Sequence, residues 1–204
     1  MNITIFIIIL TALISILGWQ NRELFDKLKL NPYMVFHKKE YFRILGHALL
    51  HADWMHLVFN MFTLFVFGSM VEEKLKIYFN HELVLYILLY SIGATIAALP
   101  SIIKHKNDHW YNSIGASGAV AAVLFAGIFF EPLMGISLYL IPIPIPGILF
   151  GIAYLAYSQY MSRKSIDNIN HDAHFAGAIF GFLFPILLKP ELFKIFLEKL
   201  FNQY

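Results

Sequence analysis

Long apolar stretches alternate with shorter polar segments along the whole chain of 204 residues. A helix that crosses a bilayer needs roughly 20 mostly apolar residues. Six stretches come close to this length, so the pattern predicts an all-α, polytopic membrane protein with six transmembrane helices. The predicted spans are Ile3–Trp19, Met55–Val71, Leu83–Ile103, Ile114–Phe130, Pro146–Met161 and Ala173–Leu188.

The segments that connect the spans carry patterns of their own. Residues 20–54 mix charged side chains with bulky apolar ones, which predicts an interfacial loop half submerged in the membrane. Residues 141–146 alternate isoleucine with proline, and because proline cannot continue a helix we expect an extended lead-in before a short helix starting at Pro146. Residues 190–204 indicate an amphipathic segment on the membrane surface. We expect residues 1–204 to form a single membrane domain.

Composition agrees with this reading and excludes several classes of function. The chain is 59% hydrophobic and 14% charged, with a mean hydropathy of +0.66, far from the balance of soluble proteins. The formal net charge of +2, with no long basic block, argues against a nucleic-acid partner. The absence of cysteine excludes disulfides, thiolate metal sites and a cysteine nucleophile. We expect a multi-pass integral protein of the cell membrane.

A candidate nucleophile lies at the start of the fourth span, in Gly115-Ala116-Ser117-Gly118. A serine in the first turn of a helix lies among free backbone N–H groups, where the helix dipole favours negative charge. Its hydroxyl can attack a carbonyl, and its own amide is a natural oxyanion donor. Gly115 and Gly118 open the backbone to close approach, and Gly118 lets a neighbouring helix pack against the serine turn. Taken alone, such a pattern is more often a packing feature.

A candidate general base lies at the start of the sixth span. His174 precedes Gly177 by three residues, and Gly177 and Gly181 are four apart, so the three share a face that can approach another helix closely. A histidine with an ordinary pKa of about 6.5 can accept the serine proton and return it to the leaving amine. Asp172 would face elsewhere on the helix, so the pattern predicts a Ser–His dyad rather than a triad.

Two polar side chains of the second span complete the predicted site. His56 and Asn60 are four residues apart and share a helix face. Imidazole and amide groups are costly in lipid without a function or a partner. Both can donate hydrogen bonds, so they are candidates for an oxyanion pocket. His51 lies nearer the interface and is more simply explained by hydrogen bonds to loop backbone.

A metal transporter or membrane metalloenzyme is an alternative, since imidazole and carboxylate ligands suit zinc. The chain has no His-Glu-x-x-His motif, and a metal site would leave Ser117 and Asn60 without a role. The dyad itself needs no metal and no organic cofactor. The candidate ligands would be His47, His51, His56, His171, Asp172 and His174.

Together the three motifs resemble those of the rhomboid family of intramembrane serine proteases. The resemblance implies a rhomboid-like six-helix bundle with Ser117 as nucleophile and His174 as its base. It also implies an oxyanion hole formed by His56, Asn60 and the Ser117 amide. The motifs that carry it are His51-(x)4-His56-(x)3-Asn60, Gly115-Ala116-Ser117-Gly118 and Ala173-His174-(x)2-Gly177.

The same resemblance assigns structural roles and a substrate class. Arg43 matches the arginine of the family's first loop, and Glu72 matches the acidic residue at the end of its second span; both are structural in the family. Substrates would be single-span membrane proteins cleaved within the bilayer, in a cavity open to the non-cytoplasmic side and capped by residues 157–172. The remaining motif residues that would support the site are His51, Gly115, Gly118 and Gly177.

The chain also departs from the family pattern. Phe42 precedes Arg43 where the family usually has tryptophan. Some members carry an aromatic residue four positions after the serine, to pack on the catalytic ring, and that position is Ala121 here. We therefore expect a bulky residue from another helix to support His174. A catalytically inactive relative that only binds membrane helices is a further alternative, and the retained Ser117 and His174 argue against it.

Overall fold

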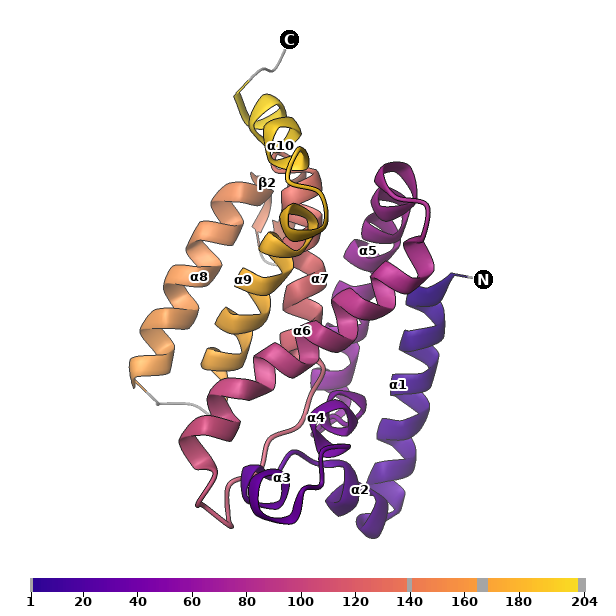
Figure 1. Cartoon of the computed structure of the whole chain (residues 1–204), viewed down its shortest axis with the longest axis vertical. Helices are drawn as coiled ribbons and strands as arrows, with labels where there is room; N and C mark the ends of the chain where they lie inside the picture. Colours follow the sequence, from indigo (N-terminus) through magenta and orange to yellow (C-terminus); the bar gives the residue numbers. More distant parts are fainter. Residues whose placement is uncertain (1, 139–140, 165–168, 202–204) are drawn as a thin grey trace.

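The computed structural model describes residues 2–138, 141–164 and 169–201, and these form a bundle of helices (Figure 1). The six longest elements are α1 (Ile3–Gln20), α5 (Trp54–Tyr78), α6 (Glu82–His105), α7 (Ser117–Phe130), α8 (Gly147–Lys164) and α9 (His171–Leu188). Each corresponds to one predicted span, so the prediction of an all-α polytopic bundle is confirmed. Four of them, α1, α5, α6 and α9, are long and apolar enough to cross a membrane by themselves.

Helix α7 lies at the centre of the bundle. It packs against α5, α6 and α9, and every residue from Gly118 to Phe130 is buried. Its 14 residues make it about 21 Å long at roughly 1.5 Å per residue, shorter than the hydrocarbon core of about 30 Å. Other helices therefore surround α7 along its length. In Figure 1 the end of α6 extends beyond the start of α7. Ser117 is therefore placed inside the bundle.

Small residues allow α9 to approach α7 closely. A Cβ atom added at Gly177 would overlap the carbonyl of Gly118, and one added at Gly181 would overlap the carbonyl of Ala122. The predicted contact between these two helices is present. Gly118 itself differs from expectation, because a side chain there would overlap Ala97 of α6 rather than meet α9 first. This glycine is thus required mainly for the approach of α6.

Residues 20–54 fold into short helices, which the sequence reading of a loop did not anticipate. Two of them begin at asparagine caps, where the side chain of Asn21 accepts from the Leu24 N–H at 3.1 Å and that of Asn31 accepts from the Met34 N–H at 3.0 Å. The elements are α2 (Arg22–Leu28), α3 (Pro32–Lys38), α4 (Arg43–Gly46) and the 3₁₀ helix η1 (His47–Leu49). They cover the end of the bundle next to the start of α7 (Figure 1).

The proline-alternating segment forms the strand β2 (Ile141–Pro146), which pairs antiparallel with β1 (Gly135–Leu138). The sequence predicted the extended segment that leads into α8, but it did not predict the strand β1 that pairs with it. Ile136 pairs with Ile145, a residue that keeps its N–H between two prolines that have none. The hairpin connects α7 to α8 at the end of α7 remote from Ser117.

The connection between α8 and α9 is shorter than the resemblance implied. Helix α8 continues to Lys164 and α9 starts at His171, so most of the expected cap over residues 157–172 is helical. Residues 165–168 lie outside the described residues.

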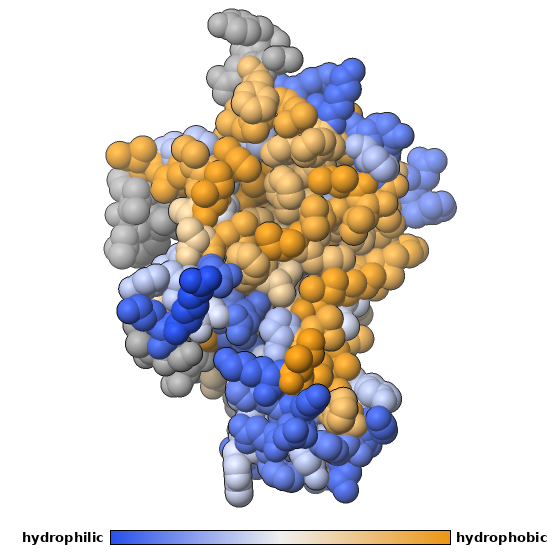
Figure 2. Space-filling view, turned by 60° about the vertical axis from the view of Figure 1, so that its left-hand side comes forward, coloured by the Kyte–Doolittle hydropathy of each residue, from blue (hydrophilic) through white to orange (hydrophobic). Residues whose placement is uncertain are grey.

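The last element, α10 (Leu192–Phe201), is amphipathic as predicted. Its buried residues Leu192 and Phe196 face the bundle, and the Phe196 ring stacks on Phe129 of α7 at 5.3 Å. Part of the apolar face of α10 therefore contacts protein. Figure 2 shows a broad hydrophobic band across the middle of the molecule and hydrophilic residues gathered at its lower end, the distribution expected of an integral membrane protein.

Candidate active site

The predicted nucleophile and base lie within hydrogen-bonding distance. Ser117 is the first residue of α7 and His174 lies in the first turn of α9. The Ser117 Oγ atom and the His174 Nε2 atom are 2.7 Å apart. In the tautomer that base catalysis requires, the hydroxyl donates to Nε2. The close α7–α9 contact at Gly177 thus brings together two residues that are 57 positions apart in the chain.

An aromatic ring from another helix supports His174. The Tyr154 ring of α8 stacks on the imidazole with centroids 6.3 Å apart and planes inclined by 23°. This contact supplies the packing that Ala121 cannot provide. The sequence predicted a bulky residue from a different helix, and the structure identifies it as Tyr154.

His56 lies directly against the turn that precedes the serine. A Cβ atom added at Gly115 would be 2.8 Å from the His56 Nε2 atom, closer than real contacts allow. Gly115 also has a backbone φ of +117°, a conformation that residues other than glycine rarely adopt. Glycine is therefore required at this position for two independent reasons, and its absent side chain leaves room for the His56 ring against the turn before Ser117.

Asn60 lines the same cavity one helical turn further along α5. It is buried, and its Nδ2 donates to the His56 carbonyl at 2.9 Å. An amide nitrogen carries two hydrogens, so this bond leaves the second one to donate elsewhere. The hydrogen bond fixes the orientation of the side chain beside His56.

The segment before Ser117 is held by hydrogen bonds along its length. Ser113 exchanges two backbone hydrogen bonds with Leu30, each of 3.0 Å. The Gly115 N–H donates to the His47 carbonyl at 3.0 Å, and the Ala116 N–H donates to the His51 Nε2 atom at 3.4 Å. Successive amides are thus directed to fixed acceptors, which preorganises the turn that carries the predicted nucleophile.

The two histidines in that set of acceptors are neutral. Burial lowers the pKa of His47 to about 4 and the pKa of His51 to about 3. The neutral His51 ring keeps a lone pair for the Ala116 amide, and it also packs edge-on against His56 with centroids 4.9 Å apart. His51 therefore contacts both the residue before Ser117 and the candidate oxyanion residue His56.

Arg43 and Glu72 lie away from the cavity and fasten other elements. The buried Arg43 donates to the Glu40 carboxylate at 2.6 Å and to the carbonyls of Asp26 and Lys29 at 2.7 and 3.0 Å, so it caps the end of α2. The Glu72 carboxylate accepts from the Ile3 N–H at 2.9 Å and from the Thr4 hydroxyl at 2.9 Å, which caps the start of α1. Both contacts are structural.

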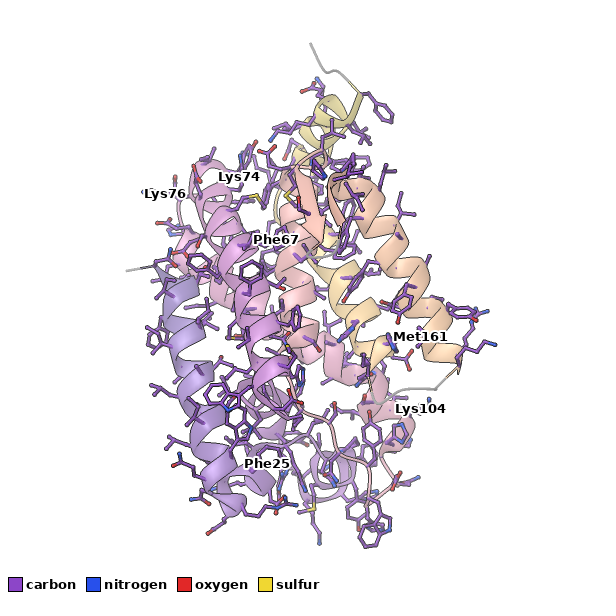
Figure 3. All side chains as sticks on the ribbon, turned by 180° about the vertical axis from the view of Figure 1, so that it is seen from behind. Phe25, Phe67, Lys74, Lys76, Lys104 and Met161 are labelled. Atoms are coloured by element: carbon purple, nitrogen blue, oxygen red, sulfur yellow. The ribbon has the colours of Figure 1, made fainter. Side chains whose placement is uncertain are left out.

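A cavity of about 1520 Å³ contains the Ser117–His174 pair. It extends between α5 and α8, which stand on either side of α7 in Figure 3, and reaches β1. Its walls are mainly apolar, and Ser117, His174, His56 and Asn60 are among the polar residues that line it. The lining residues used below are Met55, His56, Phe59, Asn60, Phe62, Ser117, Tyr154 and His174.

The other titratable candidates do not form a metal site. Within residues 2–138, 141–164 and 169–201, no three His, Asp or Glu side chains are grouped so that they could hold a metal ion. Asp172 accepts a hydrogen bond from Ser162 of α8, and His171 packs edge-on against Tyr157 at 5.6 Å. Asp172 and His171 thus make contacts of their own, and the His171 ring also lies edge-on to His174 at 5.9 Å.

Two residues of α1 contact the site region and were missed by the sequence reading. The Ser15 hydroxyl lies 3.0 Å from the His51 Nδ1 atom, and the Trp19 Nε1 donates to the His51 carbonyl at 2.8 Å. A signal was present, because the lone polar residues Thr4, Thr11 and Ser15 of this apolar span recur at spacings that place them on one helical face. All three are fully buried.

Comparison with known proteins finds similarity to rhomboid proteins. The sequence model of the Rhomboid domain matches residues 38–191. Similar proteins include "Putative rhomboid protease YdcA" of Bacillus subtilis, 29% identical over 72% of this chain and 67% of that protein. "RHOMBOID-like protein 12, mitochondrial" of Arabidopsis thaliana is 28% identical over 66% of this chain and 43% of that protein. "Rhomboid-like protein 11, chloroplastic" of the same plant is 25% identical over 77% of this chain and 56% of that protein. The chain thus spans about half the length of the two plant relatives.

Proposed function

The chain belongs to the rhomboid family, and on that premise we propose that it is an intramembrane serine endopeptidase. The single observation that carries the proposal is the 2.7 Å separation between the Ser117 Oγ and His174 Nε2 atoms at a cavity inside a membrane bundle. The two plant relatives are named as mitochondrial and chloroplastic proteins, and for this chain we propose the cell membrane. Residues 1–204 would act as one membrane domain.

In the proposed mechanism His174 removes the Ser117 proton as the oxygen attacks the scissile carbonyl. The imidazolium then gives this proton to the leaving amine, and an acyl-enzyme on Ser117 remains. Water, deprotonated by the same imidazole, hydrolyses the ester and restores the serine. Stacking on Tyr154 limits rotation of the ring between these steps.

The tetrahedral intermediate carries a negative charge that must be stabilised away from bulk water. We assign this role to the Ser117 amide, the Asn60 side chain and the His56 ring, which all border the cavity. The start of α7 contributes the positive end of its dipole at the same place. Because these donors are already held in position, little reorganisation is needed when charge develops.

The proposed substrates are single-span membrane proteins. An intact helix hides its carbonyls, so the substrate must unwind locally before it reaches Ser117. The cavity between α5 and α8 gives room for such a segment. Along α5, Met55, Phe59 and Phe62 are each more than 60% exposed and form an apolar stripe at helical spacing, which a transmembrane substrate could contact from the bilayer.

Proteolysis in liposomes tests the proposal. Wild-type protein, the Ser117→Ala variant and a Ser91→Ala control would each be incubated with a purified single-span substrate, with and without EDTA. Ser91 is a partly buried serine of α6 that does not line the cavity. We expect cleavage by the wild type and the control, no cleavage by Ser117→Ala, and no effect of EDTA.

Other results would favour the alternatives. Cleavage that EDTA abolishes would indicate a metalloenzyme. A panel of single-span substrates would also be tested. If the protein binds them without cleaving any, and its circular dichroism spectrum shows that it is folded, it is an inactive relative.

A further inference from the structure

Ser15 of α1 forms a buried contact with the segment that carries His51. The hydroxyl is fully buried and lies 2.9 Å from the Leu49 carbonyl and 3.0 Å from the His51 Nδ1 atom. On its other side, the His51 Nε2 atom accepts from the Ala116 N–H at 3.4 Å. A chain of hydrogen bonds thus connects the first helix to the residue next to the nucleophile.

The donors and acceptors in this chain fix the position of every proton. A carbonyl can only accept, so the single hydroxyl proton of Ser15 is directed to Leu49. The Ser15 oxygen must then accept from His51, which places the ring proton on Nδ1. A backbone amide can only donate, so Nε2 must carry a lone pair toward Ala116. Both ends of the chain independently require the same neutral tautomer.

We propose that Ser15 is a positioning residue for the proteolytic reaction, which holds His51 in the Nδ1–H tautomer so that its Nε2 atom orients the Ala116 amide beside Ser117. This inference rests on the proposed function. The opposite tautomer would direct an N–H group at the Ala116 N–H, and the peptide would have to rotate. Such a rotation would displace the Ser117 amide and hydroxyl from the oxyanion pocket and from His174.

The local packing of α1 supports this role. Gly18 approaches the same segment so closely that a Cβ atom there would be 2.9 Å from Leu50. Trp19 donates to the His51 carbonyl at 2.8 Å. One face of α1 therefore holds residues 49–51 through the Ser15 hydroxyl, the Trp19 indole and the close contact at Gly18. The lowered pKa of His51 agrees with a ring that stays neutral at neutral pH.

The match to the family does not supply this role. The Rhomboid domain match begins at residue 38, whereas α1 ends at Gln20. Ser15 thus lies outside the matched segment, and its contact with His51 connects α1 to the candidate active site.

Nitrogen NMR of the imidazole rings tests the tautomer directly. Protein labelled with ¹⁵N-histidine would be reconstituted in liposomes, and the His51 signals assigned by their loss in the His51→Gln variant. We expect wild-type His51 to have its proton on Nδ1 and Ser15→Ala to show loss of that single tautomer. A wild-type ring protonated on Nε2 would overturn the proposal, whatever the catalytic activity.

Kinetics with matched variants test the consequence for the reaction. Thr11→Val is the control, because it also removes a fully buried hydroxyl from α1 and lies beside Tyr90 rather than His51. We expect Ser15→Ala to lower kcat by about ten- to a hundredfold with little change in KM, by analogy with the loss found when the hydrogen-bond partner of a metal-binding histidine is removed. Thr11→Val should keep kcat within about threefold, and Ser15→Thr, which retains the hydroxyl, should recover part of the loss.

The possible failures are distinguishable. An unchanged kcat in Ser15→Ala, or an equal loss in Thr11→Val, would show that the hydroxyl has no specific role and would overturn the inference. Absence of cleavage by the wild type would instead contradict the proposed function, and the NMR measurement would still decide the tautomer.

Discussion

The two ends of α7 are built in different ways. At its start, Ser117 and the residue before it are hydrogen-bonded to His174 and His51, aromatic rings pack on both of these histidines, and a cavity lies beside them. At its end, Glu131 pairs with Lys74 and with Lys199, the latter at 2.8 Å, and Tyr78 stacks on Phe130 at 5.6 Å. The Ser117 end of α7 borders a cavity and is held by hydrogen bonds, as the proposed catalysis requires. The Phe130 end is held by stacked rings and ion pairs.

The difference indicates how a short helix can be anchored at one end and, in the proposed function, carry the nucleophile at the other. Lys199 also donates to the Phe130 carbonyl at 2.8 Å, so α10 ties down the last turn of α7. Burial would raise the pKa of Glu131, but hydrogen bonds from Lys199 and Lys74 outweigh it and lower that pKa. With its far end held by charge and stacking, α7 can present Ser117 in a fixed position.

The largest expected effect comes from removing the base at the reactive end. His174→Ala should lower turnover by about 10⁴-fold or more while the protein stays folded, because serine without its base is a poor nucleophile. The control is His81→Ala, an exposed histidine between α5 and α6. Cleavage rates and thermal unfolding of both variants would be measured, and normal turnover in His174→Ala would end the dyad hypothesis.

Loss of one oxyanion donor should have a smaller effect. Asn60→Ala and His56→Ala should each lower kcat by about ten- to a thousandfold, the usual range for such donors. KM should change little, since the charge that they stabilise develops only in the transition state. Steady-state kinetics in liposomes would measure both constants, and a pure KM effect would reassign these side chains to substrate positioning.

Crowding the helix contact behind the serine should affect folding before chemistry. Gly118→Val should lower the free energy of unfolding by about 1–3 kcal/mol, because the added side chain would overlap Ala97 of α6. Thermal unfolding in detergent would measure the loss. The double variant with Ala97→Gly should recover part of it if the overlap is the cause, and an unchanged stability of Gly118→Val would contradict the observed packing.

The smallest expected effect lies at the anchored end. Because its pKa is lowered on folding, Glu131 stabilises the protein above its ordinary pKa of 4.5, and this contribution is lost as the pH falls through the folded value. The Glu131→Gln variant should therefore lose less stability than the wild type as the pH falls from neutral to about pH 3, with the difference developing below the ordinary pKa of 4.5. Partial exposure keeps the difference at about 1 kcal/mol or below. Cleavage at neutral pH should be nearly normal, and a large loss of kcat would show that the two ends are not separate.

The sequence predicted features that depend on local pattern. The six helices follow from the lengths of the apolar stretches, and the contact between α7 and α9 follows from the spacing of Gly177 and Gly181. These properties reside in segments of a few turns. A reader of the sequence can recognise them without knowing which other elements lie nearby.

Features that depend on distant partners were not predicted. Nothing near Tyr154 indicates that its ring will support His174, and Ser15 gains its importance only because residues 49–51 fold back onto α1. The strand β1 likewise has only 4 residues, too few for its pattern to identify it, and it becomes a strand through pairing with β2. Such contacts are set by tertiary structure, which overrides local preference.

Covalent labelling of the nucleophile tests the central claim most directly. Protein in liposomes would be treated with a fluorophosphonate, which reacts with activated serines, and the modified residue identified by mass spectrometry. The account predicts one adduct, on Ser117, that is lost in the His174→Ala variant and retained in His81→Ala. Labelling at another serine, or equal labelling of Ser117 without His174, would contradict it.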